Sequence, residues 1–106
     1  MPKYLITGSY TAEGARGVLA EGGSGRRAAA GQLIESLGGT VEAFYFAFGS
    51  DDFFLIADLP GNAAAAAGGL TAAASGAIRT RTTVLLTPAE VDAATKLSPR
   101  YRAPGA

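Results

Sequence analysis

The stretch TVEAFYFAFGSDDFFLIADLP, from Thr40 to Pro60, decides the fold of this chain. Aromatic and β-branched residues fill its first part, through Phe48, and the run FFLIADL follows the four residues GSDD. Two apolar runs joined by a short turn of Gly, Ser and Asp are typical of an antiparallel β-hairpin. We therefore expect strands over residues 40–48 and 53–59.

Both faces of this hairpin are apolar. Because side chains alternate along a strand, Phe44, Phe46 and Phe48 should share one face, with Val41 and Tyr45 on the other. Helices can cover only one face of a sheet, so the second face would be exposed in a lone chain. Such a face predicts an interaction surface, and two copies packed sheet to sheet would bury it.

Before the hairpin, KYLITGSY over residues 3–10 predicts a strand, with Gly8 as a bulge or a point of close backbone approach. The glycine-rich segment that follows predicts at most a short helical turn before Gly22, because glycine destabilises helices. Ser24 would then cap a helix that ends at Gly38. Its apolar stripe is Ala30, Leu33, Ile34 and Leu37.

After the hairpin, Asn62 is expected to cap an alanine-rich helix, and a strand should run over residues 77–86. Thr87 and Glu90 then form a capping box around Pro88 and start a short helix. The order is β-α-β-β-α-β plus a terminal helix, which predicts an α+β, ferredoxin-like domain over residues 1–97 and a tail over 98–106. The single sheet would be antiparallel, with both main helices on one face.

Composition excludes several kinds of site. The chain has 106 residues, no Cys and no His, so disulfides, thiolate catalysis and the usual zinc or haem ligands are excluded. We expect no metal and no cofactor. Nine basic and nine acidic residues balance, which disfavours nucleic-acid binding, and no apolar run reaches the ~20 residues that span a bilayer. We expect a cytoplasmic protein.

Several long segments, GSYTAEGARGVLAEGGSGRR, FYFAFGSDD, IADLP and SGAIRTRTTVLLTPAEVDAATK among them, resemble the GYD domain family of small bacterial proteins. The resemblance covers residues 2–96. It implies a homodimer whose two sheets close a dimeric α/β barrel, and it implies no established activity. Where the family has Gly-Tyr-Asp, this chain has Gly49-Ser50-Asp51-Asp52, so Asp52 matches the family Asp and Asp51 stands at the Tyr position.

Candidate ligand contacts come from three residue types. Asp51 and Asp52 could act as a general acid and base or as half of a hard-cation site. Alternatively, Asp51 is a turn residue and Asp52 binds backbone amides across the hairpin. Asp58 could pair with Arg79 or Arg81 inside a barrel, or lie in solvent.

Arg81, next to Arg79 on one strand face, could hold an anionic group or belong to an interface. Tyr10 and Tyr45 could point phenols into a cavity, or simply pack in the core. Arg26 and Arg27, near a helix start, could bind acidic residues of a partner subunit, but we expect them to be solvated.

Three functions remain open at this point. The first is a homodimeric module that binds a small molecule through Tyr10, Tyr45, Asp52, Asp58 and Arg81. The second is a cofactor-free enzyme, of oxygenase or isomerase type, that uses a carboxylate or a phenol as general base on an aromatic or enol substrate. The third is a structural assembly subunit whose sheets only pack.

Overall fold

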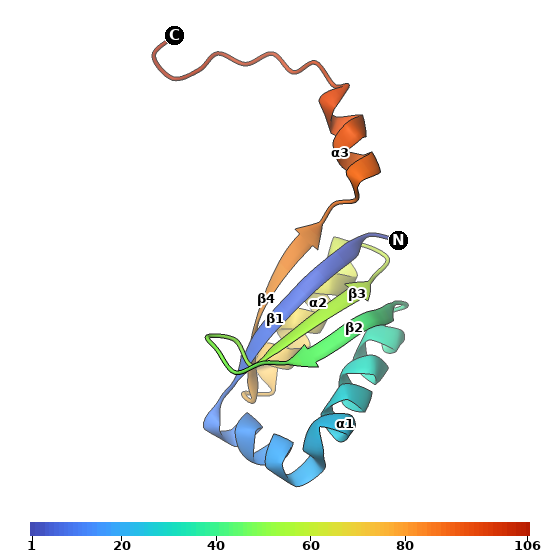
Figure 1. The fold of residues 1–106 in the computed structure, drawn as a ribbon, viewed down its shortest axis with the longest axis vertical. Coiled ribbons are helices and arrows are strands. Elements are labelled where there is room, and N and C mark those ends of the chain that lie inside the picture. The colour runs from blue at the N-terminus through green and yellow to red at the C-terminus, as the bar shows by residue number, and fades with distance from the viewer.

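A computed structural model describes all 106 residues and shows one antiparallel sheet with three helices (Figure 1). The four strands lie in the order β2-β3-β1-β4. This order and the β-α-β-β-α-β succession agree with the expected ferredoxin-like arrangement. The elements are β1 (Lys3–Tyr10), α1 (Ala12–Ser36), β2 (Thr40–Phe46), β3 (Phe53–Asp58), α2 (Asn62–Ala74), β4 (Ile78–Leu85) and α3 (Pro88–Thr95).

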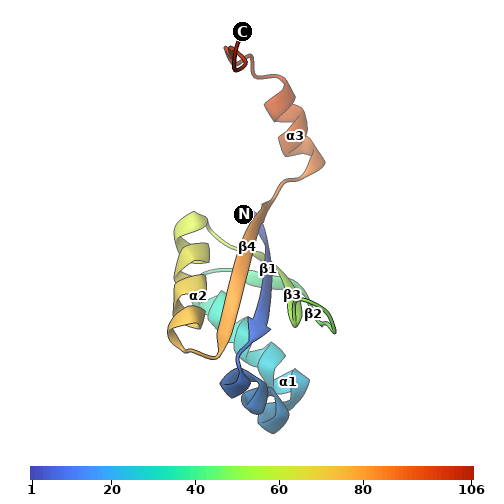
Figure 2. The same ribbon diagram turned by 90° about the vertical axis from the view of Figure 1, so that its left-hand side faces the viewer.

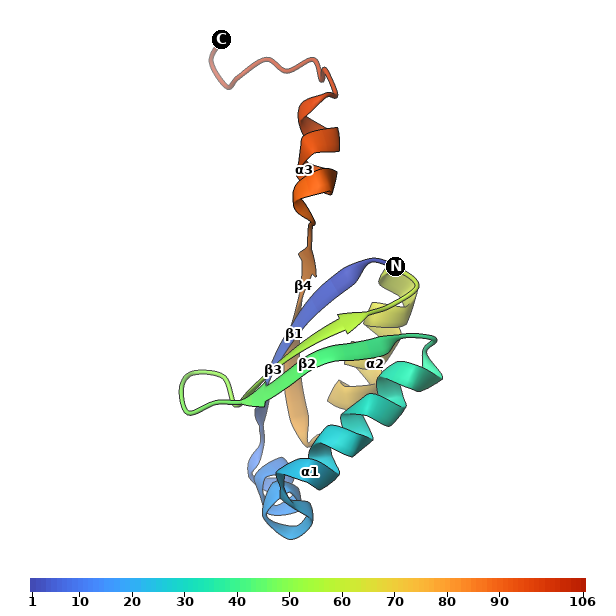
Figure 3. The same cartoon turned by 45° about the vertical axis from the view of Figure 1, so that its right-hand side comes forward.

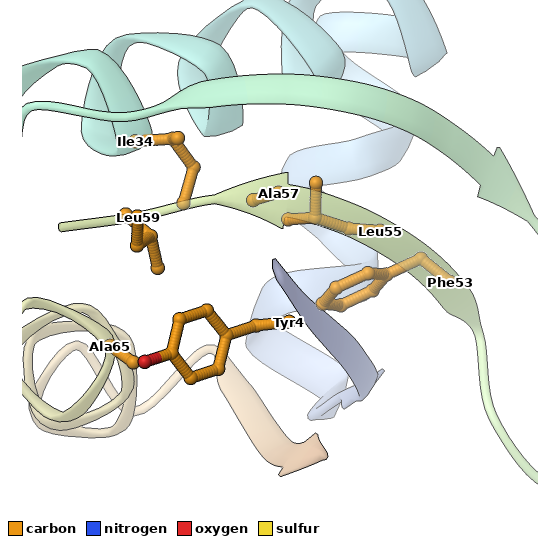
Figure 4. Close-up of a cluster of buried hydrophobic side chains, with 7 residues drawn as sticks. All are labelled: Tyr4, Ile34, Phe53, Leu55, Ala57, Leu59 and Ala65. Carbon is orange, nitrogen blue, oxygen red and sulfur yellow. The ribbon is translucent and has the colours of Figure 1, made fainter. Parts of the chain in front are cut away.

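The core lies between the sheet and the two longer helices. Helix α2 runs along β4 and helix α1 runs along β2, with both on the same side of the sheet (Figures 2 and 3). Tyr4 and Leu59 are fully buried there, and the ring of Tyr4 reaches from β1 to α2 beside Ala65 (Figure 4). The Tyr4 hydroxyl donates to Oδ1 of Asn62 over 2.7 Å, so its polar end is satisfied.

A β-bulge changes the expected faces of β2. Val41 pairs with Ala57, and Ala43 pairs with the next residue back along β3, Ile56, so Glu42 is an extra residue. Val41 therefore lies on the helix side and packs against the core, instead of sharing a face with Tyr45 as alternation predicted. The strand also ends at Phe46, so Phe48 lies in the turn and is exposed.

Helix α1 begins much earlier than the sequence indicated. Its N-cap is Thr11, whose hydroxyl accepts from the amide of Gly14 over 3.2 Å. Thr11 is itself fixed by donating from its amide to Ala77 O (3.0 Å) and from its hydroxyl to Gly76 O (2.9 Å). These tertiary bonds outweigh the poor helix propensity of the glycines. The expected boundary survives as a kink at Gly22, where φ is 76°.

Asn62 is not the cap of α2. The N-cap is Gly61, which has no side-chain capping bond, and Asn62 is already in the helix with its amide oxygen bound to Tyr4. A fully buried tyrosine hydroxyl needs an acceptor, and Asn62 serves that need instead of the helix amides.

Helix α3 and the tail leave the body of the molecule at the end of β4 (Figure 1). The predicted capping box is confirmed, with Thr87 Oγ1 accepting from Glu90 N and Glu90 Oε1 accepting from Thr87 N. No residue of α3 is buried. The radius of gyration is 16.9 Å, whereas a compact domain of this length has about 13 Å.

Candidate functional site

Small side chains leave a cavity between the two helices and the sheet, which we call the inner cavity. Its volume is about 100 Å³. The inward positions of α2 are Ala65, Gly68, Gly69 and Ala72, which cannot fill the space above the sheet. The floor and walls are otherwise apolar, contributed by Ile6, Phe53, Leu55, Ile78, Ala29, Ala30, Leu33 and Ile34, with Arg26, Thr80 and Thr82 as the polar members.

Two larger hollows lie on the same side of the sheet. The first, the β4 groove, has a volume of about 750 Å³ and lies between α2 and β4. It shares Gly69, Ile78, Thr80 and Thr82 with the inner cavity, so the two spaces meet beneath α2. The second, the hairpin groove, has about 680 Å³ and lies between the first half of α1 and the end of the β2–β3 hairpin. Its lining includes Tyr10, Val18, Leu19, Phe46, Phe48 and Asp52.

Arg26 lines the inner cavity, which corrects the expectation that it is solvated. Only 25% of its side chain is exposed, and its Nη1 lies 3.5 Å from Oε2 of Glu21. Arg27, the next residue, is exposed. The signal was present in the sequence, because Arg26 precedes Ala30 by four residues and Leu33 by seven and so belongs to the apolar stripe of the helix.

Tyr10 is half-buried and lies between the inner cavity and the hairpin groove. Its ring centroid is 5.6 Å from that of Phe53, which lines the inner cavity. Burial raises the pKa of the Tyr10 phenol, the nearby charge of Arg26 opposes this, and Asp52 adds to it. With its pKa raised from 10.0, Tyr10 is a neutral phenol at pH 7 and can donate a hydrogen bond.

Asp52 ties the hairpin to the neighbouring strand. Its Oδ2 accepts from the amide of Tyr10 over 2.8 Å, and its own amide donates to Gly8 O over 2.8 Å. The carboxylate thus binds a backbone amide, one of the two roles considered for it, although the amide belongs to β1 and not to the hairpin. Asp51 faces elsewhere and accepts from Arg81 Nη2 at 2.8 and 2.7 Å.

The remaining candidates lie on the face of the sheet that no helix covers. Tyr45 is 71% exposed there, next to Phe54. Asp58 pairs with Lys3 (2.8 Å) and not with Arg79 or Arg81, because Lys3 is its direct partner in the β1–β3 register.

Lys3 also binds Glu42 at 2.8 Å, so one ammonium joins two carboxylates. The hydrogen bonds to Asp58 and Glu42 raise the pKa of Lys3.

The five candidates therefore fall into two groups. Tyr10 and Asp52 lie together beside the cavities on the helix side, whereas Tyr45, Asp58 and Arg81 lie on the uncovered face. No group of three or more carboxylates lies close enough to hold a metal ion. None of the helices is long and apolar enough to cross a bilayer.

Comparison with known proteins gives a single result. The family described as "GYD domain" matches residues 4–95 of the chain. No curated protein and no solved structure matches this chain.

Proposed function

This chain belongs to the GYD domain family, and we propose that it acts as a homodimeric module that binds a small molecule. Membership in the family specifies no reaction, so the proposal rests on the geometry of the chain. The observation that carries it is the inner cavity, which adjoins the β4 groove and is lined by apolar side chains with a few polar groups. Sites for small ligands usually have this character.

The uncovered face of the sheet supports the homodimer and, with it, the closing of two sheets into a barrel. Phe54, Ile56 and Leu5 occupy its centre, and Tyr45 extends the apolar surface to β2. Ion pairs flank this centre, with Lys3 and its carboxylates at one end and Arg81 with Asp51 at the other. An apolar centre with a polar rim is the usual anatomy of a protein interface. We assign Tyr45, Asp58 and Arg81 to this interface.

The cofactor-free enzyme is supported less well. It needs a general base, but Tyr10 has a raised pKa and the Asp52 carboxylate already accepts from a backbone amide. We therefore propose no catalytic role for Tyr10 and Asp52, which line the hairpin groove. The cavity also argues against a purely structural subunit, because an assembly role requires no internal void.

A native mass spectrum of the gently purified protein tests the proposal first, because it reports subunit number and retained ligand together. We expect a dimer, with added mass on part of the population. A monomer at micromolar concentration would contradict the dimer.

A second experiment tests the cavity itself. Replacing Gly69 by Leu places a side chain in the space under α2, where a Cβ would have only Thr80 Oγ1 within 4 Å, at 3.8 Å. We expect Gly69→Leu to fold and to lose ligand-induced thermal stabilisation. Gly17→Leu is the matched control, because nothing lies within 4 Å of a Cβ at Gly17. Equal ligand stabilisation of both variants would show that the ligand binds elsewhere.

A further inference from the structure

We propose that the inner cavity selects ligands that carry a carboxylate on an apolar body, and that Arg26 is the residue that holds this carboxylate. The inference rests on the proposed function and adds the class of ligand to it. Three features support this inference. The guanidinium of Arg26 is incompletely paired, its carboxylate partner in the chain is exposed to solvent, and the walls of the cavity next to the β4 groove are apolar.

The guanidinium of Arg26 has more hydrogen-bonding capacity than the chain uses. Three quarters of its side chain is covered, and the side chain lies among Phe53, Leu33 and other apolar residues of the cavity. A charge in such surroundings is stabilised by an ionic partner. The only ion pair of Arg26 is one contact of 3.5 Å with Glu21, whereas a guanidinium has five N–H donors and can bind a carboxylate with two parallel bonds.

Glu21 can be displaced by a ligand. Half of its side chain is exposed, and Gly22, with its positive φ, separates Glu21 from the helical segment that carries Arg26. A long contact to an exposed carboxylate contributes little to stability. When a ligand carboxylate binds Arg26, Glu21 can return to water.

Tyr10 lies near Arg26 but lines the hairpin groove and not the inner cavity. Burial raises the pKa of the Tyr10 phenol more than the charge of Arg26 and a hydrogen bond from its side chain lower it, so the phenol stays protonated at neutral pH. The ionic part of the recognition therefore comes from Arg26. Neutral ligands of the same shape would forgo the ionic part of this recognition.

The rest of the ligand should be apolar. Ile6, Phe53 and Ile78 form the walls beyond Arg26, and Thr80 and Thr82 line both this space and the adjoining β4 groove. A ligand longer than the inner cavity can extend that way, with a polar group within reach of the threonine hydroxyls.

The test uses three acids, benzoate, phenylacetate and 3-phenylpropionate, each compared with its neutral amide. Each is titrated into the ¹⁵N-labelled full-length protein, and amide shifts are followed in ¹H–¹⁵N spectra. We expect the backbone N–H signals of Ile6, Phe53 and Thr80 to shift. We also expect at least one acid to bind about tenfold more tightly than the corresponding neutral amide compound.

Three variants assign the effect to Arg26. Arg26→Met keeps the apolar stem and should lower the affinity for the acid about tenfold while leaving the amide within about twofold. Arg27→Met, which replaces the exposed neighbouring residue, should change neither the affinity for the acid nor the affinity for its neutral amide. Glu21→Gln removes the competing carboxylate and should tighten binding of the acid only.

The outcomes separate the two proposals. If acids and amides bind the cavity equally and Arg26→Met has no selective effect, the preference for a carboxylate is wrong and the binding module stands. If none of the acids or neutral amides shifts the backbone N–H signals of the residues that line the inner cavity, the proposed binding site on the helix side is wrong. The proposed preference for a carboxylate is then wrong as well. Shifts confined to Tyr45 and Phe54 would place binding on the uncovered face and overturn both.

Discussion

Gly8 lies where the ring of Phe53 crosses β1, which confirms the close backbone approach predicted from the sequence. A Cβ at this position would clash with Phe53 Cζ and would lie 3.0 Å from Arg79 O. We expect Gly8→Ala to destabilise the protein by about 1–3 kcal/mol, the usual effect of overpacking a core. Urea unfolding measures this.

The control for Gly8 is Gly17→Ala, which adds the same methyl group in open space on α1. Alanine is the better helix former by about 1 kcal/mol, so this variant should be neutral or more stable. If both substitutions had the same effect, the packing of Phe53 over Gly8 would be wrong.

Tyr10 and Lys3 should make the protein less stable in alkali. Burial raises the pKa of Tyr10 above 10.0, and hydrogen bonds to Asp58 and Glu42 raise that of Lys3 above 10.5. Both groups bind their protons more tightly in the folded protein than in the unfolded chain. Their contribution to the stability of the folded state is therefore complete below the pKa values of the unfolded chain, and it is lost as the pH rises through the pKa values of the folded protein.

We therefore expect the urea midpoint to fall above about pH 10. In Tyr10→Phe the fall should be smaller, and the ultraviolet difference between the two proteins should show a tyrosinate that forms above pH 10.0. A tyrosinate signal at or below that pH would mean that the phenol is not buried as described.

At the scale of elements, two helices have threonine caps of the same kind but very different surroundings. Thr11 caps α1 and also bonds to Gly76, whereas Thr87 caps α3, which buries nothing. We expect Thr11→Ala to lower the free energy of unfolding by about 1–2 kcal/mol. Thr87→Ala should leave it unchanged, because an eight-residue helix without packing does not contribute to the cooperative unit.

Urea unfolding again measures the free energy, and amide exchange of α3 reports its local helicity. Rapid exchange in α3 of the unmodified protein is expected. Protected α3 amides would show that the helix packs on something, such as a second copy of the chain.

The elements were predictable from sequence to an uneven degree. The presence of the hairpin, β4 and the capping box of α3 follows from local patterns, and the structure agrees with it, but the bulge at Glu42 and the end of β2 at Phe46 were not predicted. The start of α1 does not, because the bonds that fix Thr11 come from Gly76 and Ala77, distant in the chain. The inner cavity is likewise a property of two helix faces together, so neither alanine-rich segment shows it alone.

At the scale of the molecule, the uncovered face makes a prediction about assembly. Phe54, 39% exposed, lies near its centre with Tyr45 beside it. Phe54→Asp would bury an unpaired charge in a sheet-to-sheet dimer, so we expect it to yield folded monomers. Leu70→Asp, on a 71% exposed residue of α2, should leave the dimer intact. Sedimentation velocity distinguishes these outcomes, and a Phe54→Asp variant that stays dimeric would exclude this face as the interface.

The bulge at Glu42 has a consequence for the permitted length of the chain. Val41 and Ala43 already oppose consecutive residues of β3, so the pairing on either side of Glu42 is that of a continuous ladder. Deleting Glu42 would preserve every other pair of the strand and send no side chain to the opposite face. Its loss would remove one carboxylate from Lys3 and leave Asp58 in place. A deletion of this one residue would therefore shorten β2 and leave the core of the protein unchanged.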